Sequence, residues 1–187
     1  MLVSATNLHE YFRGALMAAL KKTSCQVTEN TQAYIVYLLS DFTRSENAWA
    51  GVDRGEKPIF ALLLSRAQEA DPNEALKTFK HVGDTTLYWS GFFHESINAQ
   101  VVNHRYYQSI GESAYSSAAR LAGAPVFGEL ADRFGDLVQI LRLISLYGEG
   151  NFMKEPSPAQ LLDWIERYRR SKDPELLDLL LKHGVNV

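Results

Sequence analysis

Apolar residues recur along most of this chain at intervals of three and four positions, the spacing of one face of an α-helix. No stretch shows the strict alternation of apolar and polar residues that is typical of a β-strand. The pattern therefore predicts an all-α protein: one helical bundle of about seven to eight helices with essentially no sheet. The helices that we expect cover, approximately, residues 8–22, 29–42, 58–67, 73–90, 99–122, 125–147, 158–168 and 174–183.

Several of these helices carry a recognisable start signal. Asp71 and Asp173 each precede a proline and a glutamate, the order of an N-cap residue, a first-turn proline and an acidic first turn. Ser157 stands three residues before Gln160, which is the spacing of a capping box. Asn7 and Glu10 have the same spacing, so we expect the first helix to begin at Leu8.

Turn-forming residues divide the chain into two parts. Residues 45–57 are polar and contain two glycines, which predicts a long loop. Residues 151–158 contain two prolines and are the best candidate for a linker. We therefore expect a helical bundle core over residues 1–150 and a C-terminal helical hairpin over residues 151–187, packed on the same domain.

Composition narrows the function classes. The chain has 187 residues, of which 46% are hydrophobic and 22% charged, and a net charge of −3, so it lacks the basic excess typical of a nucleic-acid-binding protein. No apolar run approaches the roughly 20 residues that span a bilayer, and we see no signal peptide. The single cysteine, Cys25, suits a reducing compartment. We expect a cytoplasmic protein that binds neither nucleic acid nor membrane.

Glycines within two of the expected helices need a reason, because glycine destabilises a helix interior by about 1 kcal/mol relative to alanine. Gly83 lies inside the helix expected over residues 73–90. In the helix expected over residues 99–122, Gly111, Ala114 and Ala118 share one face. Small side chains at these positions predict that the two helices pack closely against each other.

Polar and aromatic residues gather around the predicted contact. On the first helix, His81, Asp84 and Tyr88 follow one another at steps of three and four. On the second helix, His104, Gln108 and Glu112 follow one another at steps of four, and Tyr115 stands three positions beyond Glu112. If both rows face inward, they enclose a polar pocket with an aromatic rim, suited to a small ligand. The candidate pocket residues are His81, Asp84, Tyr88, His104, Arg105, Tyr107, Gln108, Glu112 and Tyr115.

These residues indicate a protein that binds rather than catalyses, with a protein partner or a small molecule as the ligand. Arg105 is a candidate ion-pair partner for Asp84 or Glu112. No nucleotide-binding loop or nucleophile motif is present, and no cofactor is favoured.

Two alternatives remain open. The first is a metal- or haem-dependent enzyme or sensor that uses the same pocket, with His94 as a conceivable haem ligand. The paired Glu-x-x-His motifs of helical di-iron proteins are missing, as is His-Glu-x-x-His, so we expect no metal. The second is a structural homo-oligomer whose interface is Tyr88, Trp89, Phe92 and Phe93, because aromatic residues are enriched at interfaces.

Overall fold

The computed structural model describes residues 5–44, 60–93, 104–147 and 155–187. Within these ranges all regular secondary structure is helical, and no strand is present, which confirms the predicted fold class. The nine helices of the described residues are α1 (Ala5–Thr23), α2 (Glu29–Arg44), α3 (Phe60–Glu69), α4 (Pro72–Phe92), α6 (His104–Ala122), α7 (Pro125–Asp132), α8 (Phe134–Tyr147), α9 (Pro158–Ser171) and α10 (Pro174–Lys182).

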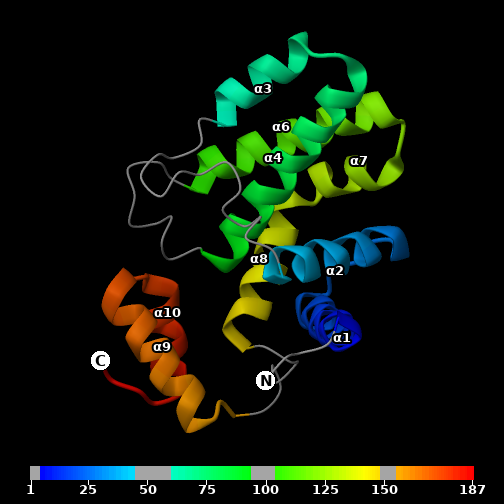
Figure 1. Ribbon diagram of the computed structural model, residues 1–187. Helices are drawn as coiled ribbons and strands as arrows, with labels where there is room; N and C mark the ends of the chain where they lie inside the picture. Colours follow the sequence, from blue (N-terminus) through cyan, green and yellow to red (C-terminus); the bar gives the residue numbers. More distant parts are fainter. Residues whose placement is uncertain (1–4, 45–59, 94–103, 148–154) are drawn as a thin grey trace.

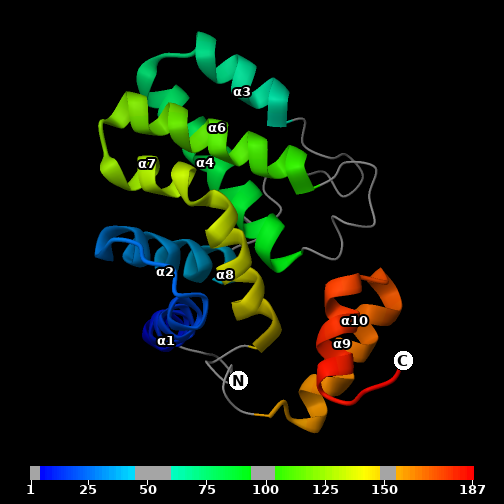
Figure 2. The same ribbon diagram turned by 180° about the vertical axis from the view of Figure 1, so that it is seen from behind.

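Helices α4, α6 and α8 lie at the centre of the arrangement (Figure 1). Helix α3 lies on the outer side of α4 and α6, α7 runs back along α6, and α2 contacts both α4 and α7. Helix α1 packs on α2 and α8. Seen from behind, α9 and α10 form a hairpin beside the end of α8 (Figure 2). Residues of α2 and α6 therefore both contact α4, whereas the C-terminal helices α9 and α10 lie beside the end of α8.

The start signals read from the sequence act as predicted at three helices. The Asp71 carboxylate accepts hydrogen bonds from the backbone N–H groups of Asn73 and Glu74 at the start of α4. Asp173 caps α10 in the same way. Ser157 and Gln160 form both bonds of a capping box at α9. The expected start of the first helix is wrong, because α1 begins at Ala5 and Asn7 lies inside it.

The stretch expected to form one helix over residues 125–147 forms two. Helix α7 ends at Asp132 and α8 begins at Phe134, with Arg133 between them in a non-helical conformation. The apolar stripe continues across the break, but its two halves contact different neighbours. Helix α7 packs on α6 and α2, whereas α8 packs on α4 and α1. A single straight helix cannot follow both directions, so packing overrides the local periodicity here.

Helix α8 supplies much of the core. Its side chains Leu137, Ile140 and Leu141 are fully buried, as is Phe134 at its start. Among the described helices, none is long and apolar enough to cross a bilayer. The expected loop over residues 45–57, the expected start of a helix at residue 99, the candidate haem ligand His94 and the first half of the expected linker over residues 151–158 lie outside the described residues.

Candidate functional site

The close contact predicted between the helix over residues 73–90 and the helix over 99–122 is confirmed as the packing of α4 on α6. A Cβ atom placed on Gly83 would lie 2.7 Å from the Tyr115 ring of α6. A Cβ atom on Gly111 would collide with the Phe134 ring and would lie 2.7 Å from the Thr86 hydroxyl of α4. Both glycines are therefore required by the approach of the neighbouring groups, and the seam is filled by side chains at these positions.

Asp84, a candidate from the sequence, is the centre of a buried polar network. Asp84 is only 5% exposed. One carboxylate oxygen accepts hydrogen bonds from the hydroxyls of Tyr34 (2.5 Å) and Tyr115 (2.8 Å). The other oxygen accepts from the Lys80 ammonium at 2.6 Å. Because Tyr34 belongs to α2 and Tyr115 to α6, this network joins three helices.

The electrostatics keep both phenols protonated. Burial raises the pKa of the Tyr115 hydroxyl well above its ordinary value, and the negative charge of Asp84 raises it further. Burial and the same carboxylate also raise the pKa of Tyr34. The Lys80 ammonium additionally lies 5.3 Å from the centre of the Tyr34 ring, within the range of a cation–π contact. The two hydroxyls are thus fixed as donors to Asp84, which favours a role in holding the helices together over proton transfer.

Two members of this network were missed in the sequence. Lys80 stands four residues before Asp84 on the same helix, so helical spacing alone contained the signal for that ion pair. Tyr34 lies fifty positions away in α2, and nothing local to it indicates the contact. Arg105, expected as a partner of Asp84 or Glu112, is exposed near the start of α6, and Lys80 is the cation beside Asp84.

The remaining polar candidates lie nearer the surface. His81 is exposed on α4. Gln108 donates to the Glu112 carboxylate at 2.8 Å, one turn apart on α6, and this pair is exposed. The structure therefore joins Asp84 and Tyr115 by a hydrogen bond, leaves His81 exposed and pairs Gln108 with Glu112.

Tyr88 and Tyr107 belong to a second feature, which we call the aromatic cluster. It lies where the end of α4 meets the start of α6, next to α3 and α2. Its ring contacts, at centroid distances between 4.7 and 6.4 Å, fall into two groups, one around Tyr88 and one around Tyr107. The members are Phe42, Phe60, Tyr88, Trp89, Phe92, Phe93, Tyr106 and Tyr107.

Exposure is uneven within the aromatic cluster. Phe60 is 1% exposed and Tyr107 is 4% exposed, whereas Trp89, Phe92 and Phe93 are only partly buried. His104 begins α6 at the same end of the α4–α6 seam and is half-buried. The candidates thus separate into a polar end around Asp84 and an aromatic end around Tyr107.

The described residues contain no group of three or more histidine, cysteine, aspartate or glutamate side chains arranged to hold a metal ion. Comparison with known proteins adds no assignment: no family model, no curated protein and no solved structure matches this chain.

Proposed function

We propose that this chain is a helical binding protein that holds a small, largely apolar ligand between α4 and α6, at the aromatic cluster. The observation that carries the proposal is the partial burial of Trp89, Phe92 and Phe93 beside fully packed rings. Aromatic rings contribute a large apolar area, so leaving several of them part-exposed near the end of one helix is typical of a surface that receives a ligand or partner.

The polar handles for such a ligand are His104 and the Tyr107 hydroxyl. Burial raises the pKa of Tyr107, so its hydroxyl remains a donor at neutral pH. Ligand sites combine apolar walls with a few polar groups that fix orientation, and this end of the seam offers both. The polar end is less suited to a ligand, because a guest would have to replace hydrogen bonds that Asp84 already accepts.

The test uses anilinonaphthalene sulfonate, an anionic aromatic probe whose fluorescence rises in apolar sites. We expect saturable binding to the native chain, with energy transfer from tryptophan. The double variant His104→Ala/Tyr107→Phe should weaken binding about tenfold, the effect of losing one or two hydrogen bonds, and leave Tm nearly unchanged. The matched control is His81→Ala, an exposed histidine on α4, which should leave probe binding unaltered.

Two outcomes would contradict the proposal. A large fall in Tm for the double variant would mean that these side chains are scaffolding. A dimer in light scattering that Trp89→Lys converts to a monomer would assign the aromatic cluster to a second copy of the chain, which is the homo-oligomer alternative.

We propose the cytoplasm as the location, because the one cysteine, Cys25, is a free thiol.

A further inference from the structure

The C-terminal hairpin, formed by α9 and α10, meets the rest of the protein at the last turns of α8 (Figures 1 and 2). Three side chains on one face of α9 donate to three successive carbonyls there. Trp164 Nε1 donates to Leu146 O at 3.0 Å. An Arg167 guanidinium N–H donates to Ser145 O at 3.3 Å, and Gln160 Nε2 to Tyr147 O at 3.4 Å.

These contacts have a clear physical basis. The last carbonyls of a helix lack partners within the helix and carry its negative partial charge. Residues 160, 164 and 167 follow the spacing of one helical face, so a single side of α9 presents all three donors. The charge of Arg167 also complements the negative end of α8. Helix α9 thus caps α8 from outside.

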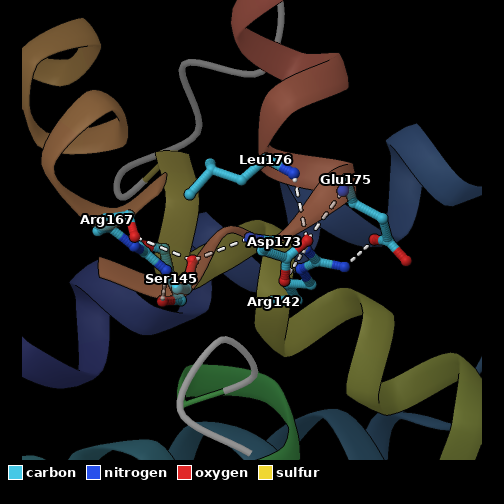
Figure 3. Close-up of polar contacts among 7 residues, drawn as sticks. Arg142, Ser145, Arg167, Asp173, Glu175 and Leu176 are labelled. Atoms are coloured by element: carbon cyan, nitrogen blue, oxygen red, sulfur yellow. Dashed lines mark hydrogen bonds and ion pairs between the residues drawn. The ribbon is translucent and has the colours of Figure 1, made fainter. Parts of the chain in front are cut away.

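A buried ion pair makes a second connection. Arg142 of α8 is 4% exposed, and its guanidinium lies 3.3 Å from both carboxylate oxygens of Asp173, which is 1% exposed. A second N–H of Arg142 bonds the Glu175 carboxylate, as Figure 3 shows. Arg142 lies within the apolar stripe of α8, and we did not single it out in the sequence.

Asp173 has two roles at once. Its Oδ1 atom accepts from the backbone N–H groups of Glu175 and Leu176 and so caps α10, while Arg142 neutralises its charge (Figure 3). Without Arg142, docking would leave a carboxylate buried and uncompensated. When the hairpin is undocked, water can hydrate both charges, so the ion pair adds little net stability to the docked state but is needed for it.

We propose that the C-terminal hairpin docks reversibly as one unit, with Arg142 as its latch, while the α4–α6 core stays folded. Undocking would uncover the carbonyl end of α8 and the Arg142 guanidinium, and it would remove the indole of Trp164 from its contacts with Leu146 and Tyr147. This device is independent of the proposed ligand site, because it shares no residue with the aromatic cluster.

The test is amide hydrogen exchange of the full chain near neutral pH. In the wild type, amides of α9 and α10 should exchange at least about tenfold faster than those of α4 and α6, because they open in a smaller, less stable unit. Arg142→Met should raise the hairpin exchange by about a further tenfold or more and leave α4 and α6 unchanged. The matched control is Arg133→Met, which removes a half-exposed ion pair with Asp136 and should have no effect on the hairpin.

A second variant separates the latch from simple loss of packing. Asp173→Asn retains a side-chain acceptor for the α10 N-cap and removes the charge. Combined with Arg142→Met, it should restore part of the hairpin protection that Arg142→Met alone removes, because no uncompensated carboxylate remains. Exchange that rises equally in all helices, no change with Arg142→Met, or no recovery in the double variant would each overturn the proposal.

Discussion

The α4–α6 seam and the junction between α8 and the C-terminal hairpin hold their helices together by different means. At the seam, Gly83 and Gly111 let rings and backbone approach so closely that no side chain fits at either position. At the junction, the Trp164 ring packs on Tyr147, and contact also depends on side-chain donors and one buried ion pair, Arg142 with Asp173.

The two contacts differ in how much hydration their groups would recover if the helices separated. Apolar surface at the seam gains nothing from exposure, so separating α4 from α6 loses the whole burial free energy. Charges at the junction recover hydration when it opens, which offsets part of what is lost. We therefore expect the seam to unfold only with the whole bundle and the junction to open by itself.

The largest effect that we expect is from overpacking the seam. Gly111→Leu forces a branched side chain against the Phe134 ring and the Thr86 hydroxyl, both of which are fully buried. We expect a loss of about 3 kcal/mol or more in the free energy of unfolding, measured by urea denaturation. Gly128→Ala in α7 is the matched control: nothing lies within 4 Å of the added Cβ, so it should be neutral or stabilising. A neutral Gly111→Leu would disprove close packing.

A smaller effect should come from the polar network within the same seam. Tyr115→Phe removes one hydroxyl donor from the Asp84 carboxylate while the ring keeps its packing against Phe127. Hydrogen bonds to charged groups contribute about 1.5–3 kcal/mol, and we expect a loss in that range. Tyr34→Phe is the comparison at a more exposed site and should cost less. Equal effects, both near zero, would show that Lys80 alone is sufficient to stabilise Asp84.

The smallest effect concerns a third junction, between α2 and α7. The Glu129 carboxylate of α7 accepts from the Thr28 backbone N–H at 3.0 Å and from the hydroxyls of Thr28 and Thr31 at the start of α2. Partial burial raises the pKa of Glu129, but these hydrogen bonds lower it more, so the pKa lies below its ordinary value of 4.5. Glu129→Gln should cost about 1 kcal/mol at neutral pH, comparable with losing a helix cap.

The sign of the pH dependence follows from that shift. A lowered pKa in the folded state means that the ionised carboxylate stabilises the fold above pH 4.5, and that this contribution is lost as the pH falls through the lowered pKa. The stability difference between wild type and Glu129→Gln should therefore be full at neutral pH and shrink below pH 4.5. Thermal unfolding across that range measures it. Thr31→Val, which removes a donor from the same carboxylate, should also reduce the loss of stability in acid. If stability varies with pH in both variants as it does in the wild type, Glu129 is not the source of the acid sensitivity.

Local patterns in the sequence were sufficient for the helical fold class and for most helix boundaries. The caps at Asp71, Ser157 and Asp173 are set by residues within one turn of each other, and so is the Lys80–Asp84 ion pair. The packing of α4 on α6 was also predictable, because glycine within a helix is unfavourable unless a neighbour requires it. The caps and the ion pair depend on interactions between near neighbours in the chain, whereas the contact of α4 with α6 joins distant residues and was indicated only by the glycines that it requires.

Contacts between distant parts of the chain were decided by the tertiary structure alone. Nothing in the local pattern indicates the partners of Tyr34 and Arg142: one joins Asp84 across fifty residues, and the other reaches Asp173, the N-cap residue of the last helix. The break at Arg133 between α7 and α8 has the same origin, since the two halves of one apolar stripe follow different partners. Helical spacing determines which side chains share a face, but the neighbour that each face meets depends on how all the helices fill the core together.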